Sequence, residues 1–307
     1  MMKRHIALVL AALVPWLVSS CTRGEATNGE AAHGAATNGL TAYAVTGVVH
    51  KVMVQEKSAT IAHQEIPGYM EAMTMDFSVT NAAELTGLLP GDVVTFRMSV
   101  TANDGWIDQI RKTGATNAIT LPPEVFRRAR YVEPVSVGDL MPDYTFTNEL
   151  GKIVRLSDFK GKAYAFNFIF TRCPFPTFCP RQSKGFSEAH AKLKAVPGGP
   201  TNWHFLSITI DPAYDTPARL KGYAATYHAD PARWSFLTGD LEDITAIGEQ
   251  VGLQFWREKP DALPNHNVRT VVVNAAGRIQ WVTVQNEWET DALVEQMVKA
   301  AAAKGEG

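Results

Sequence analysis

Residues 163–180 of this chain read AYAFNFIFTRCPFPTFCP. The eight residues that end at Phe170 are almost all apolar, a pattern that predicts a strand buried on both faces of a sheet. Cys173 and Cys179 follow this strand directly, and a helical pattern begins after them at residue 182. A cysteine between a buried strand and a helix lies near the helix N-terminus, where unpaired N–H groups and the helix dipole favour the thiolate over the thiol.

Strand and helix patterns continue to alternate on the C-terminal side of the cysteines. Residues 203–210 predict a second buried strand, and residues 269–273 and 278–284 predict a strand pair around a turn. Strands that alternate with helices and end in a hairpin and a helix favour an α/β thioredoxin-like domain, which we place at residues 136–302. The helical patterns cover residues 182–196, 216–227, 241–251 and 289–302.

The N-terminal half of the chain has an all-β pattern. Turn signals such as Pro90-Gly91-Asp92 separate five apolar or alternating runs. Five short strands in so short a segment predict a small closed barrel domain of the all-β, OB-like class, which we place at residues 41–114. Residues 115–135 are interpreted as a connector between the two domains. The five runs are residues 45–54, 59–63, 73–79, 93–100 and 106–110.

The N-terminus has the pattern of an export signal. Two basic residues precede an apolar run over residues 6–18. This run is too short to span a bilayer, which needs roughly 20 residues, and it fits a secretory signal. It ends in Val-Ser-Ser-Cys21, which resembles a bacterial lipobox. We therefore expect a lipoprotein signal peptide at residues 1–20 and a lipid on Cys21 that anchors the protein to the membrane. A plain signal peptide with an incidental cysteine is the alternative.

The segment after Cys21 predicts a tether on the periplasmic side of a bacterial cell envelope. Residues 21–40 are mostly small and polar, bury too little apolar surface to fold, and are interpreted as a flexible linker. Thr22, rather than aspartate, after Cys21 favours the outer membrane.

The whole chain is 46% hydrophobic and 20% charged, with a formal net charge of −2. This composition is typical of a soluble globular protein and gives no reason to expect a nucleic-acid partner.

A first candidate metal site lies in the predicted barrel. Residues 63–77 begin with His63 and contain Met70, Met73 and Met75. Because Met73 and Met75 are two residues apart, they point to the same face of a strand. Thioether and imidazole groups together suit Cu(I) or Ag(I), and they suit Zn(II) or Mg(II) poorly. The alternative is that the methionines fill the barrel core, as methionine commonly does.

This stretch resembles the periplasmic copper- and silver-binding proteins of the CusF type, whose signature is a histidine followed by a Pro-x-Met-Thr-Met-x-Phe-like strand. The resemblance implies that His63, Met73 and Met75 bind the ion. Met70 stands where the family has a tryptophan that stacks over the ion, and the spacing from the histidine to the methionines is one residue shorter. Met70 as a third sulfur ligand and Tyr69 as the aromatic cover are both left open.

The two cysteines of the second domain form another candidate site. The chain has three cysteines, Cys21, Cys173 and Cys179. Two cysteines six positions apart form a site, whereas an exported chain held together by disulfides would carry more of them. A thiolate pair binds a soft metal ion or undergoes disulfide exchange. A structural disulfide is the remaining alternative.

Six stretches of this domain, together with a late histidine before a strand, match one family. The stretches are residues 138–143, 156–162, 170–173, 179–180, 207–217 and 234–239. They resemble the Sco/SenC proteins, which bind one copper through two cysteines and one histidine. The resemblance implies the ligands Cys173, Cys179 and His266, and we expect Asp211 to support the site. Sco proteins usually have three residues between the cysteines. Five are present here, which leaves open whether exchange chemistry has replaced copper delivery.

Sco proteins deliver copper to the dinuclear copper site of cytochrome oxidase, or keep its cysteines reduced. The resemblance therefore implies a copper metallochaperone rather than an enzyme. The barrel would capture Cu(I), and the second domain would hold copper, with Cu(II) left open, and pass it to a protein acceptor such as a cytochrome oxidase subunit. Tethering favours transfer between the two sites within the chain. The alternatives are an envelope thiol–disulfide reductase that uses Cys173 and Cys179, and sequestration of copper or silver.

Overall fold

The computed structural model describes residues 39–102, 104–116, 132–257, 262–283 and 289–303, all of which fall within the unit His33–Gly307. The predicted signal peptide, the lipidation site Cys21 and nearly all of the linker at 21–40 lie outside these ranges, as does most of the connector. Within the described ranges, the helices are too short or too polar to cross a bilayer.

The first sheet contains the five strands that the alternating runs predict. Neighbouring strands are antiparallel in the order β3-β2-β1-β4-β5. Buried positions alternate along the strands, so that one face of the sheet encloses Ile61, Phe77 and Phe96. A register shift in β1 after Val49 is typical of the irregularities that let a sheet curl. The strands are β1 (Thr41–Met53), β2 (Ser58–His63), β3 (Met73–Ser78), β4 (Asp92–Val100) and β5 (Gly105–Thr116).

The OB-like class is confirmed for this domain, but its barrel is partly open rather than closed. Among the described residues, the outer strands β3 and β5 are joined by a parallel bridge between Val79 and Ile107 and not by a continuous ladder. The physical reason is length, because β3 has six residues and the chain then turns into a short 3-10 helix at Ala82–Leu85.

The second sheet has the central strand that the sequence predicts. Every residue of β8 is buried, as is every residue of its parallel neighbour β9. The strand order is β14-β13-β8-β9-β10-β6-β7, with β8, β9 and β10 parallel and the outer strands antiparallel. The strands are β6 (Thr145–Asn148), β7 (Ile153–Arg155), β8 (Ala163–Ile169), β9 (Trp203–Thr209), β10 (Trp234–Thr238), β13 (Thr270–Val273) and β14 (Ile279–Thr283).

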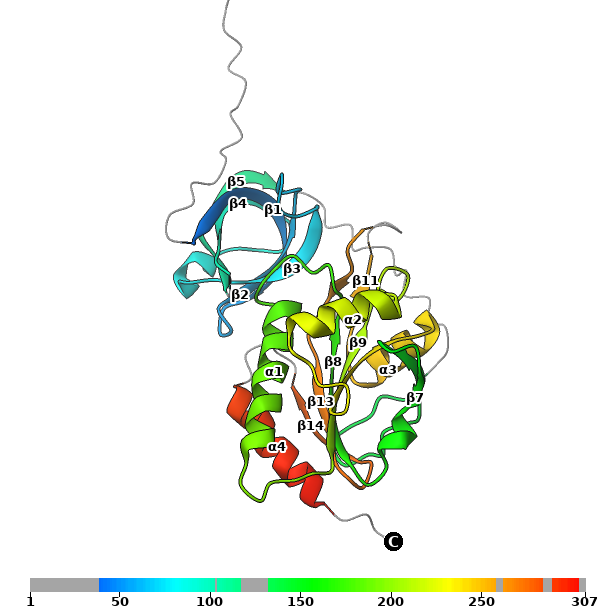
Figure 1. The fold of residues 1–307 in the computed structure, drawn as a ribbon. Coiled ribbons are helices and arrows are strands. Elements are labelled where there is room, and N and C mark those ends of the chain that lie inside the picture. The colour runs from blue at the N-terminus through cyan, green and yellow to red at the C-terminus, as the bar shows by residue number, and fades with distance from the viewer. Residues whose placement is uncertain (1–38, 103, 117–131, 258–261, 284–288, 304–307) are drawn as a thin grey trace, which may run out of the picture. The chain divides into compact units, whose positions relative to one another are not determined.

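Helices cover both faces of this sheet, which confirms the thioredoxin-like α/β class. α1 and α2 are joined by a hydrogen bond between Ser183 Oγ and Tyr223 Oη at 3.0 Å. α1 and α4 are joined by an ion pair between Lys192 and Asp291. α3 lies on the opposite side of the strands from α1 and α4 (Figure 1). The remaining elements are η2 (Leu156–Phe159), α1 (Cys179–Ala195), α2 (Pro217–Thr226), α3 (Leu241–Gln250), α4 (Thr290–Ala302) and a two-stranded ribbon of β11 (Phe255–Trp256) and β12 (Asn265–His266).

Candidate metal centre

The two cysteines of the second domain lie between the end of β8 and the start of α1. Cys173 is half-buried, Cys179 is fully buried as the first residue of α1, and both are free thiols. The loop between them is held by hydrogen bonds from Cys173 N to Phe170 O and from Phe178 N to Phe175 O, each of 3.2 Å. Pro180 follows in the first turn of α1, where its missing N–H leaves no intrahelical bond unmade.

The surroundings of the two thiols drive their pKa values apart. Burial opposes ionisation of Cys173, but hydrogen bonds from the side chain and backbone of Cys179 outweigh it and hold the pKa of Cys173 below its ordinary value. Burial raises the pKa of Cys179 well above its ordinary value, and the neighbouring Cys173 raises it further. The thiolate that a helix N-terminus favours is therefore that of Cys173, which accepts a hydrogen bond from the backbone N–H of Cys179, the first residue of α1.

His266 stands beside this cysteine pair. It belongs to β12, which pairs with β11 through Phe255. His266 Nδ1 lies 2.8 Å from Asn267 O. Because a carbonyl oxygen accepts hydrogen bonds and does not donate them, Nδ1 carries the proton and the lone pair is on Nε2. That lone pair lies 3.9 Å from Cys179 Sγ, and burial lowers the pKa of His266, which favours the neutral ring. A histidine that donates one N–H to a carbonyl is oriented to bind a metal through the other nitrogen.

The three predicted ligands of the second domain do not meet in a finished metal site. Among the described residues, His, Cys, Asp and Glu side chains do not gather in threes close enough to hold an ion. Cys179 and His266 are the close pair, while Cys173 lies beside Cys179. A three-ligand metal site would therefore require movement of the Cys173 loop or a donor side chain of another kind.

The barrel brings its predicted ligands to one face. His63 in β2 is directly opposite Met73 in β3, so the two side chains share a face, and Met75 lies two residues further on the same face. His63 Nδ1 lies 2.7 Å from Gln64 O, which again leaves the lone pair on Nε2. Nε2 of His63 is buried and has no hydrogen-bond partner among the described residues. A buried acceptor without a partner is costly, and a soft cation would satisfy it.

Met70, rather than Tyr69, lies next to the methionine pair. Met70 is 4% exposed and lines a small cavity together with Met73 and Met75. The Tyr69 ring stacks on Tyr43 with ring centroids 4.7 Å apart, and its hydroxyl donates to Pro174 O at 3.2 Å. Tyr69 is thus occupied elsewhere, and the arrangement favours the alternative in which Met70 is the additional donor.

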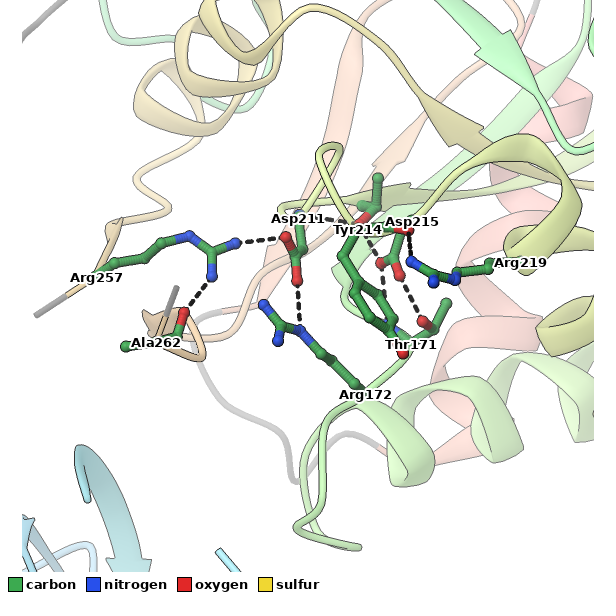
Figure 2. Close-up of polar contacts among 9 residues, drawn as sticks. Thr171, Arg172, Asp211, Tyr214, Asp215, Arg219, Arg257 and Ala262 are labelled. Atoms are coloured by element: carbon green, nitrogen blue, oxygen red, sulfur yellow. Dashed lines mark hydrogen bonds and ion pairs between the residues drawn. The ribbon is translucent and has the colours of Figure 1, made fainter. Parts of the chain in front are cut away.

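Asp211 lies at the centre of a polar network that includes Arg172, the residue before Cys173 (Figure 2). It is 1% exposed and accepts hydrogen bonds from two arginines, from Arg172 Nε at 2.9 Å and from Arg257 Nη2 at 2.6 Å. Arg172 precedes Cys173 directly, and Arg257 follows β11, the partner strand of the one that carries His266. The carboxylate thus connects the segment of Cys173 to the β11–β12 ribbon, which carries His266.

A second buried carboxylate stabilises the end of β8. Asp215 accepts hydrogen bonds from Thr209 Oγ1 at 2.5 Å and Thr171 N at 3.0 Å, and also from the Thr171 hydroxyl. Tyr214 lies between the guanidinium groups of Arg219, 3.8 Å from its ring centroid, and Arg172, 4.6 Å away (Figure 2). Asp211 could be singled out from the sequence, but the two arginines and Asp215 could not, because only the folded chain brings residues 172, 211 and 257 together.

Two family models match the chain. Residues 133–302 match SCO1/SenC, and residues 42–112 match the copper-binding periplasmic protein CusF. Two curated relatives align with parts of the chain. The SCO1 protein homolog of Bacillus subtilis (strain 168) is 38% identical over 96 residues, which are 31% of this chain and 47% of the relative. The mitochondrial SCO2 homolog of Bos taurus is 27% identical over 139 residues, which are 44% of this chain and 50% of the relative.

The chain thus spans about half the length of these two curated relatives. A solved structure of BsSco, a member of the Sco family of cytochrome c oxidase assembly proteins, aligns at 25% identity with a TM-score of 0.47. This alignment covers 56% of the present chain and 99% of the BsSco chain.

Proposed function

Because the chain belongs to the SCO1/SenC family, we propose that it is a copper metallochaperone of the cell envelope, which binds Cu(I) and delivers it to the copper site of a cytochrome oxidase subunit. The observation that carries this proposal is the Nε2 lone pair of His266, 3.9 Å from Cys179 Sγ, in a domain whose two thiols are both free. Thiolate and neutral imidazole are the donors that suit monovalent copper.

The barrel supports the same conclusion with different residues. His63 presents a buried, unpartnered nitrogen, and Met73 and Met75 present thioethers on the same face. None of these groups carries a charge when His63 is neutral, and burial lowers the pKa of His63. A monovalent ion therefore brings one charge into the site, while a divalent ion would bring two with no anion to offset them.

The test is an anaerobic titration of the full chain with Cu(I), with bicinchoninate as the competing chelator, followed by mixing with a reduced acceptor domain. The expected result is tight Cu(I) binding that a Cys173→Ser/Cys179→Ser variant weakens, and transfer of the ion to the acceptor. A chain that binds no Cu(I) more tightly than bicinchoninate does would sink the proposal. Binding without transfer to any acceptor would replace delivery with sequestration of copper or silver.

A thiol–disulfide reductase is the second candidate, and the difference between the two thiols favours it. Cys173 is half-buried with a lowered pKa, as an attacking thiolate requires, and Cys179 is buried with a raised pKa, as a resolving thiol requires. Cys173 would attack an acceptor disulfide. Cys179, after losing its proton, would then displace the acceptor thiol and leave a Cys173–Cys179 disulfide. Reduction of a disulfide-bonded acceptor by the copper-free chain, and not by its Cys179→Ser variant, would support this function.

Cys21 is the proposed anchor for either function. A lipid on this residue would hold the protein on the periplasmic side of the envelope, and the outer membrane is the favoured site. Labelling cells with a radioactive fatty acid tests the anchor, because label on the parent and none on a Cys21→Ala variant are expected. Unlabelled parent protein recovered in the soluble periplasmic fraction would contradict it.

A further inference from the structure

Within the described residues, one cavity is lined by candidate ligands from both metal sites. It is small, at about 20 Å³, and because a single water needs roughly 10–15 Å³ by this measure, it has room for one small species. Three methionines line it from the barrel side, Met70, Met73 and Met75. Cys173 and His266 line it from the thioredoxin-like domain.

We propose that this cavity is a single composite Cu(I) site, in which thioethers of the barrel and the thiolate and imidazole of the second domain bind the same ion. This inference rests on the proposed function and specifies its site. The composite site accounts for the lack of a finished three-ligand group among the His, Cys, Asp and Glu side chains of the described residues. The missing donors are methionine sulfurs.

Hydrogen bonds between residues adjacent to the ligands hold the two halves of the cavity together. Thr74, between Met73 and Met75, donates its backbone N–H to the side-chain oxygen of Asn265 at 2.8 Å. Asn265 directly precedes His266. Tyr69, which precedes Met70, donates its hydroxyl to the carbonyl of Pro174, which follows Cys173. Each bond therefore fixes one barrel ligand against one ligand of the second domain.

Phe175 joins the two halves through apolar packing. It lies in the loop between the cysteines, is 2% exposed, and has its ring centroid 6.0 Å from that of Phe77 in the barrel. Its ring also lies against Gly105 at the start of β5. A Cβ atom at position 105 would come within 2.7 Å of the Phe175 ring, so this contact requires glycine. The cysteine loop is therefore packed against the barrel through Phe175.

The chemistry of the site is ligand exchange at an ion whose oxidation state does not change. As Cu(I) moves from the barrel side, a bond from Cys173 sulfur to copper forms while a bond from a methionine sulfur breaks. No electron is transferred. Any proton on the thiol leaves to water as the thiolate binds. Because thiolate carries the charge that thioether lacks, the exchange moves the ion toward the anionic donor.

The first experiment is a double-mutant cycle on the full chain, with Cu(I) alone as the probe and bicinchoninate as the competitor. One variant is Met73→Leu/Met75→Leu, which removes both thioethers and keeps most of the side-chain volume. The second variant is Cys173→Ser/Cys179→Ser, and the third carries all four substitutions. Each of the first two variants is expected to lower the affinity for the first equivalent of Cu(I) at least tenfold. In the combined variant, the affinity is expected to fall by less than the product of these two factors.

Copper K-edge X-ray absorption of the one-equivalent complex adds a direct readout. The number of sulfur atoms bound to copper is expected to decrease in the methionine variant, although its cysteines are intact. Two equivalents in the parent chain, each weakened by one variant alone, with an unchanged sulfur shell, would overturn the composite site and leave the metallochaperone intact. No binding in the parent chain would instead overturn the proposed function.

A packing variant tests the same inference away from the ligands. Gly105→Ala is expected to displace the Phe175 ring and weaken the first equivalent of Cu(I) several-fold. Gly222→Ala in α2 is the matched control, because a Cβ atom there meets nothing within 4 Å beyond its chain neighbours and the backbone of its own helix, and its Cu(I) affinity is expected to equal that of the parent. Equal affinities for all three chains, with Gly105→Ala folded by circular dichroism, would count against the composite site.

Discussion

Replacing Asp211 with asparagine tests whether the network of Figure 2 supports the cysteine loop. In the parent chain each carboxylate oxygen accepts from one guanidinium, Arg172 on one side and Arg257 on the other. Asparagine keeps one carbonyl oxygen and turns an amino group toward the second arginine. One charge-assisted hydrogen bond is therefore lost, and two donors face each other in its place.

The size of this effect follows from burial. A hydrogen bond to a charged group contributes about 1.5–3 kcal/mol to the free energy of unfolding. Asp211 is 2% exposed at its side chain, but the side chains of Arg172 and Arg257 are 30% and 23% exposed. Water therefore offsets part of the loss. We expect a loss of about 2 kcal/mol, which at about 2–4 °C per kcal/mol lowers the Tm by about 4–8 °C.

Thermal unfolding of the copper-free chain measures the stability, and the alkylation rate of Cys173 measures the position of the loop. The matched control is Asp108→Asn, because Asp108 also accepts two hydrogen bonds from an arginine, Arg97, but this pair lies at the surface. Exposed pairs contribute about 0–1 kcal/mol. The reasoning is refuted if the Asp211 variant unfolds within 1 °C of the parent, or if the control costs as much.

Two further predictions concern titrating groups. Because the pKa of Cys173 is lowered and that of Cys179 is raised, iodoacetamide is expected to modify Cys173 of the copper-free chain at least tenfold faster near pH 7, as followed by peptide mass spectrometry; equal rates would contradict this assignment. Burial, with Lys162 and Arg233, lowers the pKa of His204 to about 4. Between pH 6.5 and 4, His204 is therefore protonated in the unfolded chain and neutral in the folded chain. As the pH is lowered through this range, this difference reduces the free energy of unfolding by about 3 kcal/mol. In urea titrations at pH 7 and 4.5, a His204→Gln variant is expected to lack most of this fall, and an unchanged pH dependence would show that another group causes it.

The central strands and the helices of the second domain could be predicted because their patterns are local. β8 is apolar at six of its seven positions, with Asn167 the exception, and it is buried throughout. β6 and β7 were not predicted, because both are short and half-exposed and because the partner of β6 in the sheet, β10, lies far along the chain. β11 and β12 have two residues each, too few for any periodicity to appear.

The candidate ligands were predictable from side-chain chemistry, but their arrangement was not. Soft donors such as Met73 and Cys173 are recognised by residue type and spacing alone. That they line one cavity depends on contacts between residues about a hundred or more positions apart, such as Tyr69 with Pro174. No local pattern records such contacts. Phe175 is the clearest case, because in the sequence it is an aromatic residue among prolines and in the structure it is buried against Phe77 of the barrel.

The spacing of the cysteines has a physical explanation in this packing. At the level of sequence, five residues between Cys173 and Cys179 are a departure from the family and imply a looser site. In the structure the additional length is not loose, because Phe175 is buried against Phe77 and Gly105 and the neighbouring Pro174 carbonyl accepts a hydrogen bond from Tyr69. The ordering entropy of the longer loop is offset by contacts with the barrel. The loop length and the presence of the barrel are therefore linked. A cysteine loop of this length is ordered by packing against the barrel, and the composite site depends on that ordered loop.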